Sequence, residues 1–247
     1  MRLLVTAGNT QVQIDRVRCL TNIFSGRTGA AIALAAYERG HDVTLLTSRP
    51  EAIVDLNPPQ QLGPERWRPL GYTTFADLER FLGEEVQRGG YDVIIHSAAV
   101  SDYLAAGIYA PAPGTRFNDA TGGWSGTAPA LVDRAAAKVK SDEPELWLRL
   151  RRAPKLVDKI RRDWRFGGLL VKFKLEVGAS DDQLLAVAEA SRQHSDADLM
   201  VANTLEGASA WAYLGPRDGS YQRVSRRELP ERLLDAIALK TEERRHG

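Results

Sequence analysis

The sequence predicts an α/β protein with a doubly wound, Rossmann-like and mostly parallel sheet. Short apolar runs typical of buried parallel strands recur along the chain, and helical patterns stand between them. The first strand is also followed by a glycine-containing loop that leads into a helix. Strands that alternate with helices join by right-handed crossovers, which give a doubly wound sheet. We expect one domain over residues 1–247.

Each element follows from its local pattern. Short apolar runs predict buried strands, and apolar residues at helical spacing predict helices. In the first half of the chain, these patterns give strands at 3–5, 42–47 and 91–96 and helices at 29–39 and 76–88. In the second half, they give strands at 145–150, 169–175 and 198–202, helices at 155–164, 181–194 and 230–243, and a hairpin over 210–224.

Residues 105–137 interrupt this rhythm. Pro, Gly and Trp are scattered among small residues, and neither helical nor strand periodicity is sustained. A stretch of this length without periodicity in a compact domain is usually functional or mobile. We therefore expect an insertion or an added strand flap over 105–137.

Composition excludes several classes of partner. The chain has 33 Lys+Arg against 32 Asp+Glu, whereas a protein that binds nucleic acid or anionic lipid needs a basic excess. A single cysteine excludes a disulfide framework and a multi-cysteine metal site. No apolar stretch approaches the roughly 20 residues of a membrane helix. We expect a cytoplasmic protein with no nucleic-acid partner, no membrane partner and no metal ligands assigned.

The loop after the first strand is the first candidate binding site, because ligands of open α/β sheets bind outside the carboxyl ends of the strands. It ends in N-I-F-S-G-R-T-G at residues 22–29 and runs into a helix. Glycines let an anion approach the backbone, and both the helix amides and Arg27 favour negative charge. The stretch is either a phosphate-binding loop or an ordinary helix start capped by Ser25.

Two common nucleotide motifs are absent. Gly8, Gly26 and Gly29 lack the G-x-G-x-x-G spacing, and no acidic residue directly follows the second strand to hold a ribose. The sequence also lacks G-x-x-x-x-G-K, and no tyrosine has a lysine four residues later, as a short-chain reductase requires. A standard P-loop and hydride transfer are both disfavoured, and an NADPH-dependent reductase remains the weakest alternative.

Short motifs stand in a fixed order along the chain. They are V-T-A-G-N-T, I-D-R-V-R and T-N-I-F-S-G-R-T-G within 5–29, A-A-V-S-D-Y at 98–103, K-V-K-S at 138–141, A-P-K-L at 153–156, F-K-L-E at 173–176 and D-L-M-V-A-N at 198–203. Together they resemble the phosphopantothenoylcysteine synthetase family, of the DNA/pantothenate metabolism flavoprotein C-terminal domain type. The resemblance covers residue 3 to about residue 206.

The resemblance implies a ligase that joins 4′-phosphopantothenate to L-cysteine in coenzyme A biosynthesis. The reaction would pass through an acyl nucleotidylate and release pyrophosphate, with ATP or CTP as co-substrate and Mg²⁺ as cofactor. The resemblance also implies a homodimer in which a strand flap of one subunit helps to close the site of the other. Many bacterial relatives carry a flavin-dependent decarboxylase in front of the synthetase, and we expect this chain to be a stand-alone synthetase.

The resemblance also assigns residues to the site. As catalytic groups it implies Asn22 to hold the acyl nucleotidylate, Lys138 to pair with phosphate oxygens, and Asp102 to contact the nucleotide or its magnesium. The implied nucleotide contacts are Gly8, Ser25, Gly26, Ala98, Ala99, Pro154, Lys155 and Phe173. The implied substrate contacts are Arg18, Arg27 and Asn203.

Some positions depart from the family pattern. Arg16 and Phe24 replace the usual proline and serine. Ser191 and Ser195 lie in the helix that normally carries lysines for the triphosphate. A diverged relative that binds nucleotide or phosphopantothenate without ligating them is therefore the alternative reading.

Overall fold

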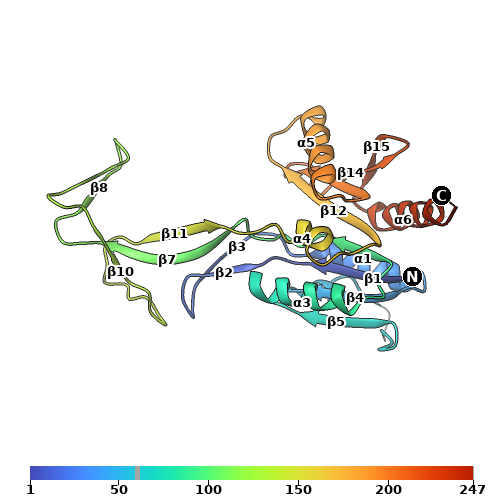
Figure 1. The fold of residues 1–247 in the computed structure, drawn as a ribbon, viewed down its shortest axis with the longest axis horizontal. Coiled ribbons are helices and arrows are strands. Elements are labelled where there is room, and N and C mark those ends of the chain that lie inside the picture. The colour runs from blue at the N-terminus through green and yellow to red at the C-terminus, as the bar shows by residue number, and fades with distance from the viewer. Residues whose placement is uncertain (59–61, 247) are drawn as a thin grey trace. The chain divides into compact units, whose positions relative to one another are not determined.

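The structure is a computed structural model that describes residues 1–58 and 62–246. The chain divides into two compact units (Figure 1). Unit 1 comprises Met1–Thr10, Ile23–Val100 and Lys155–Gly247, and unit 2 comprises Gln11–Asn22 and Ser101–Pro154. In the described part of the chain, no helix combines the length and apolarity needed to cross a membrane.

Unit 1 is built on an eight-stranded sheet of order β15-β14-β13-β12-β6-β1-β4-β5. Its strands are β1 (Arg2–Ala7), β4 (Asp42–Thr47), β5 (Trp67–Gly71), β6 (Val93–His96), β12 (Leu169–Glu176), β13 (Leu199–Thr204), β14 (Trp211–Arg217) and β15 (Ser220–Ser225). The strands from β5 to β13 pair in parallel, while β14 and β15 are antiparallel. Counted in chain order, the parallel strands follow the dinucleotide-binding order 3-2-1-4-5-6. The predicted Rossmann-like, mostly parallel sheet is confirmed, and strand order reverses between β1 and β6.

The helices of unit 1 cover both faces of this sheet (Figure 1). They are α1 (Arg27–Glu38), α2 (Glu51–Val54), α3 (Phe75–Arg88), α4 (Leu156–Arg162), α5 (Asp181–His194) and α6 (Leu229–His246). Alternation along β13 decides the face: Leu199 and Val201 pack in the core cluster of α1 and α6, while Met200 and Ala202 pack under α5. Capping boxes begin α3 and α5, at Thr74 and Ser180.

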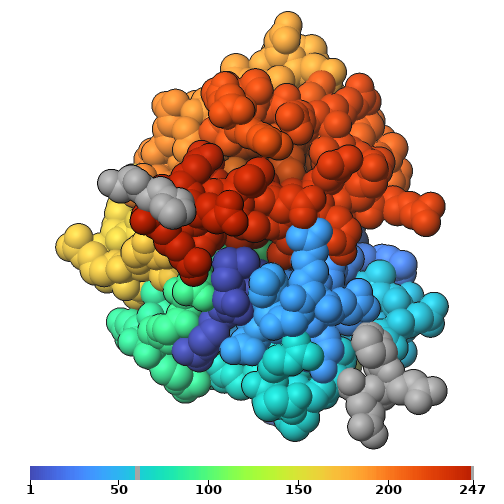
Figure 2. Space-filling model, turned by 90° about the vertical axis from the view of Figure 1, so that its right-hand side faces the viewer, coloured from blue at the N-terminus to red at the C-terminus, as the bar shows by residue number. Residues whose placement is uncertain are grey.

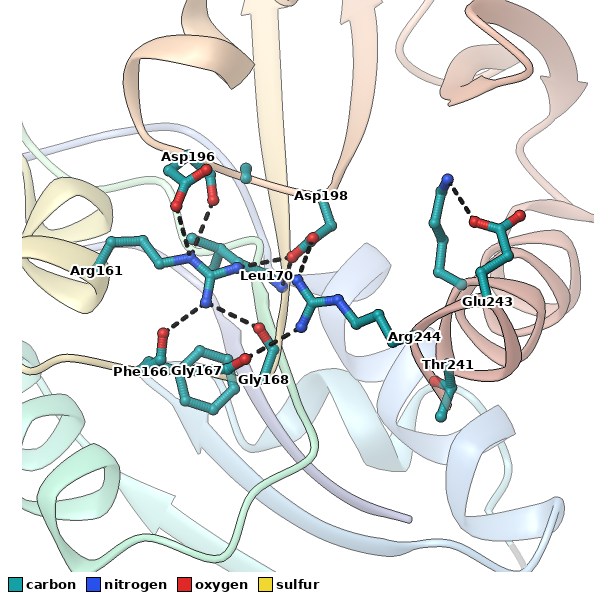
Figure 3. A network of polar contacts seen from close by, with 12 residues as sticks. Arg161, Phe166, Gly167, Gly168, Leu170, Asp196, Asp198, Thr241, Glu243 and Arg244 are labelled. Carbon is teal, nitrogen blue, oxygen red and sulfur yellow. Dashed lines mark hydrogen bonds and ion pairs between the residues drawn. The ribbon is translucent and has the colours of Figure 1, made fainter. Parts of the chain in front are cut away.

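The C-terminal helix is tied to the rest of unit 1 by charged contacts. Arg39, directly after α1, pairs with Glu231 and Asp235 of α6, and Figure 2 shows the red α6 beside the blue α1. At the amino ends of β12 and β13, the Asp198 carboxylate accepts hydrogen bonds from Arg161 at 2.7 Å and Arg244 at 2.5 Å (Figure 3). These contacts lie at the opposite end of the strands from the carboxyl edge, so they stabilise the scaffold.

Unit 2 contains a three-stranded antiparallel sheet of order β10-β7-β11. Its strands are β7 (Tyr103–Pro111), β10 (Leu131–Asp133) and β11 (Trp147–Arg152), with two small hairpins formed by β2 (Gln11–Gln13), β3 (Cys19–Thr21), β8 (Arg116–Asn118) and β9 (Gly123–Ser125). The rings of Phe117, Trp124 and Trp147 lie with centroids 4.6–5.1 Å apart.

The stretch that lacked periodicity in the sequence therefore contains β8, β9, β10 and most of β7. The expected flap over 105–137 lies inside unit 2, which also takes in residues 11–22 and 138–154. The predicted strand at 145–150 is present as β11, but it pairs antiparallel with β7 and not within the eight-stranded sheet.

Candidate active site

A cavity of about 240 Å³ opens in unit 1 where strand order reverses. Six of the residues assigned from the sequence line it: Gly8, Gly26, Ala98, Ala99, Phe173 and Asn203. They come from the carboxyl ends of β1, β6, β12 and β13 and from the start of α1. Residues from distant segments of the sequence therefore lie in one cavity at the carboxyl ends of the strands, as predicted.

The carboxyl ends of β1, β4 and β6 meet around Gly8, which lines the cavity. The Ala99 amide donates to the Gly8 carbonyl at 2.8 Å, and the Asn9 amide donates to the Ser48 hydroxyl at 2.9 Å. Gly8 has φ +87°, and a Cβ there would lie 2.3 Å from Ser48 Oγ. Only glycine fits this position, because both the backbone conformation and the space exclude a side chain.

The amino end of α1 packs directly against this junction. Gly26 is the N-cap residue, with φ +78°, and a Cβ on it would lie 2.6 Å from the Gly8 nitrogen. A Cβ on Gly29 would lie 2.7 Å from Ala7 Cβ. No side chain caps α1, so the reading of Ser25 as an ordinary cap is wrong. The first amides of α1 keep their positive potential beside the cavity.

Two cationic side chains line the cavity. Lys174 of β12 pairs with Glu176 at 2.8 Å. Arg226, which follows β15, donates to the Thr28 hydroxyl, and burial lowers its pKa. The sequence reasoning did not single out Arg226, because it examined the residues after the parallel strands and Arg226 follows an antiparallel hairpin.

His96 lies buried behind the cavity wall. Its Nδ1 is 3.0 Å from the Thr6 hydroxyl, which accepts a hydrogen bond from the Ala98 amide at 3.1 Å. Burial lowers the pKa of His96 to about 4, and the charge of Lys172 acts in the same direction. The Thr6 hydroxyl thus lies between neutral His96 and the Ala98 amide, and this hydrogen-bonded relay orients the amide at the edge of the site.

Ser191 and Ser195, near the carboxyl end of α5, lie beside a cationic side chain. Lys172 of β12 donates to Ser195 Oγ at 2.5 Å and to the Ser191 carbonyl at 3.0 Å. Ser195 Oγ donates in turn to Asp158 Oδ1 at 2.6 Å. Burial lowers the pKa of Lys172.

Unit 2 has a separate pocket of about 500 Å³, lined by Arg18, Lys138 and Lys140 among others. The side chain of Asp15, which is 0% exposed, holds two residues of the pocket lining, Arg18 and Val139, in place. Its carboxylate accepts from the Arg18 guanidinium at 2.7 Å and from the Val139 amide at 3.1 Å. The hydrogen bond from Arg18 holds the pKa of Asp15 far below its usual range, with backbone amides adding to the effect. The structure thus brings Arg18 and Lys138 into one pocket.

The remaining assigned residues lie outside the lining of these two pockets. Arg27 pairs with Asp55 at 3.5 Å, and both side chains are more than half exposed. The others are Asn22, Asp102 and Pro154 in unit 2 and Ser25 and Lys155 in unit 1, and their roles stay predictions. Ser25 lines a separate cleft of about 250 Å³ with Phe24 and Arg49. Among residues 1–58 and 62–246, no three His, Cys, Asp or Glu side chains gather as a metal site.

The strand order and the glycine-lined carboxyl edge define the class of this chain: an α/β protein with the dinucleotide-binding topology. Residues 1–110 match the model of the DNA/pantothenate metabolism flavoprotein C-terminal domain. This match confirms the family resemblance carried by the sequence motifs, and residues 1–110 are the part of the chain that it covers.

Relatives and solved structures agree with this assignment. Coenzyme A biosynthesis bifunctional protein CoaBC of Thermococcus kodakarensis is 32% identical over 241 residues, which cover 96% of this chain and 50% of that protein. The homologue of the same description from Methanocaldococcus jannaschii is 25% identical over 83% of this chain and 40% of its own length. This chain therefore spans about half or less of these relatives. The DNA/pantothenate metabolism flavoprotein of Streptococcus pneumoniae has a TM-score of 0.74 at 25% identity, covering 97% and 99% of the two chains.

Proposed function

We propose that this chain is a phosphopantothenate–cysteine ligase of coenzyme A biosynthesis. It would join 4′-phosphopantothenate to L-cysteine through an acyl nucleotidylate, with release of pyrophosphate. The observation that carries the proposal is the cavity at the switch point, which collects Gly8, Gly26, Ala98, Phe173 and Asn203 from separate motifs. The relationship to proteins named for coenzyme A biosynthesis over 96% of this chain supports the same substrate class.

The chemistry fits the groups present. Formation of an acyl nucleotidylate develops negative charge on the α-phosphate and in the departing pyrophosphate, so it needs amides and cations and no protein nucleophile. Unit 1 supplies the uncapped amides of α1 together with Lys174 and Arg226. Unit 2 carries Arg18 and Lys138 in a pocket of its own.

In the second half-reaction, the cysteine amine attacks the activated carbonyl. The C–N bond forms as the bond from the carbonyl carbon to the nucleotide phosphate oxygen breaks, and the nucleoside monophosphate leaves. We assign the Asn22 amide to the acyl carbonyl and Asp102 to the nucleotide. Mg²⁺ would reach the reaction bound to triphosphate oxygens, as is usual for this ion.

The proposal includes ATP or CTP as the co-substrate. It also includes a homodimer. Phe173 is half-buried in the carboxyl half of β12, and its ring is the group that we assign to the nucleobase. Mass measurement of the protein in solution tests the dimer, and a monomeric mass would remove it from the proposal.

The proposal is tested by incubating the protein with 4′-phosphopantothenate, cysteine, Mg²⁺ and either ATP or CTP. We expect pyrophosphate release and an amide product, detected by mass spectrometry, with at least one nucleotide. Lys138→Ala should lower turnover, while Lys240→Ala, which removes a lysine paired with Glu243 on α6, serves as the matched control. No release above the blank with either nucleotide would refute the ligase.

A diverged relative that binds without ligating is the second candidate, because Ser191 and Ser195 hydrogen-bond with Lys172 where the family usually has lysines. Nucleotide binding by calorimetry, without pyrophosphate release, would favour it. Quenching of NADPH fluorescence would revive the reductase alternative.

A further inference from the structure

We propose that Arg226 is a substrate-binding residue of the unit 1 cavity, and that its guanidinium holds a phosphate group of one of the two phosphorylated substrates. The inference rests on the proposed function for the identity of those substrates. The anion site itself is independent of that function and follows from the charges around the cavity.

Arg226 is placed at the cavity by the fold. It directly follows β15, and its backbone amide donates to the Ala210 carbonyl at 2.9 Å, which fixes the main chain there. Its side chain lines the cavity with Gly8, Gly26 and Thr28. The guanidinium donates to the hydroxyl of Thr28, the second residue of α1.

This position is electrostatically unfavourable for a cation. The amino end of a helix carries a partial positive charge and favours anions, and the first turn of α1 contains no acidic residue to offset it. Among the described residues, no carboxylate lies within ion-pairing distance of Arg226. Burial lowers the pKa of Arg226, and no neighbouring acid opposes that effect.

Several other arginines of unit 1 differ from Arg226 in having a carboxylate partner. Arg39 contacts Glu231 and Asp235, Arg161 contacts Asp198, and Arg192 contacts Glu189. Even Lys174, on the same cavity, has Glu176 at 2.8 Å. Arg226 is thus a half-buried cation whose polar side-chain partner is a neutral hydroxyl.

A phosphate group satisfies both positive features at once. A guanidinium presents a planar set of donors that matches phosphate oxygens bidentately, and helix amides bind the remaining oxygens. The glycines that line the cavity let such a ligand reach the backbone, since Gly8 and Gly26 carry no side chain between it and the amides. A neutral ligand would leave both positive potentials uncompensated.

The test compares Arg226→Gln with the wild type and with Arg227→Gln, an exposed arginine one residue further on that does not line the cavity. We expect Arg226→Gln to raise the KM of one phosphorylated substrate at least about 10-fold, because a hydrogen-bonded charged contact of about 1.5–3 kcal/mol is lost. A rise confined to 4′-phosphopantothenate assigns that phosphate, and a rise confined to the nucleotide assigns its phosphates. Arg227→Gln should leave both values unchanged, and unchanged values in Arg226→Gln would overturn the proposal.

A second measurement is independent of turnover. Inorganic phosphate and pyrophosphate should raise the Tm of the wild type and of Arg227→Gln, but should raise that of Arg226→Gln much less. Without ligand, Arg226→Gln should unfold at the same Tm as the wild type or higher, since it removes an uncompensated cation; a residue with a purely structural role would lower it. If ligase activity is absent but this phosphate-dependent difference is present, the anion site stands and only the proposed function fails. Equal Tm shifts in all three proteins would overturn the proposal.

Discussion

His96 makes the stability of unit 1 sensitive to mildly acidic pH. The side chain is buried at the end of β6, where desolvation lowers its pKa from 6.5 to about 4, with a contribution from the Lys172 charge. Between these two values, the unfolded chain binds a proton that the folded chain does not. Stability contributed by neutral His96 is therefore fully present above pH 6.5 and is lost as the pH falls toward 4.

The size of the effect follows from the same two values. Titration of His96 lowers the free energy of unfolding by about 2 kcal/mol at pH 5, relative to neutral pH. Below pH 4, the loss is about 3 kcal/mol. This is a large share of the stability of an ordinary domain, which is about 5–15 kcal/mol. His41, whose pKa is also lowered chiefly by burial, changes stability in the same direction.

The assay is urea unfolding followed by circular dichroism at pH 7.5 and pH 5.0, for the wild type and His96→Gln. The variant loses the Thr6 relay and should be less stable at pH 7.5. Its further loss between the two pH values should be smaller than that of the wild type by about 2 kcal/mol, because contributions from carboxylates and His41 are common to both proteins. Equal losses in the two proteins would refute the reasoning.

Three further predictions concern packing and hydrogen bonding. Gly29→Ala would place Cβ 2.5 Å from Ser97 Oγ. The overpacking cost of about 1–3 kcal/mol outweighs the roughly 1 kcal/mol gained in helix propensity, so the urea midpoint of unfolding should fall. Gly167→Ala, where the Cβ would meet open space, should leave the midpoint unchanged. Asp15→Ala removes the acceptor of the Val139 amide and should speed hydrogen exchange over residues 137–140, measured by mass spectrometry; unchanged exchange would contradict the role of Asp15. Asp198→Ala removes the carboxylate that Arg161 and Arg244 share and should cost about 2–3 kcal/mol of unfolding free energy; a loss below about 0.5 kcal/mol would count against that network.

The central elements were predictable because local pattern and tertiary environment agree there. Residues 42–47 and 181–194 have the predicted bounds, since the first is an apolar run buried on both faces and the second begins with a capping box. The edge strand β5 was missed. The strand β5 contains Pro69 and alternates in exposure, and a proline argues against a strand unless the strand lies at an edge, as β5 does.

An added strand flap was expected here, but local pattern did not place most of the antiparallel strands of unit 2, for a related reason. The nine residues of β7 mix alanine, tyrosine and Gly107, so no sustained alternation marks them as strand. Pairing with β10 and β11 creates the strand, and that pairing depends on residues 20 to 49 positions away in the chain. Local periodicity carries no information on such partners.

What the sequence alone determined is the order of elements, the family and most of the carboxyl edge around Gly8 and Ala98, because those depend on short runs and on the direction of parallel strands. What only the tertiary structure decided is the charge environment of the site. Thr28 and Arg226 are 198 positions apart, and no local pattern shows that they meet. Likewise, Asp15 and Val139 come together from segments 124 positions apart. Burial and partnering belong to the folded chain, and they determine which cations have a carboxylate beside them and which do not.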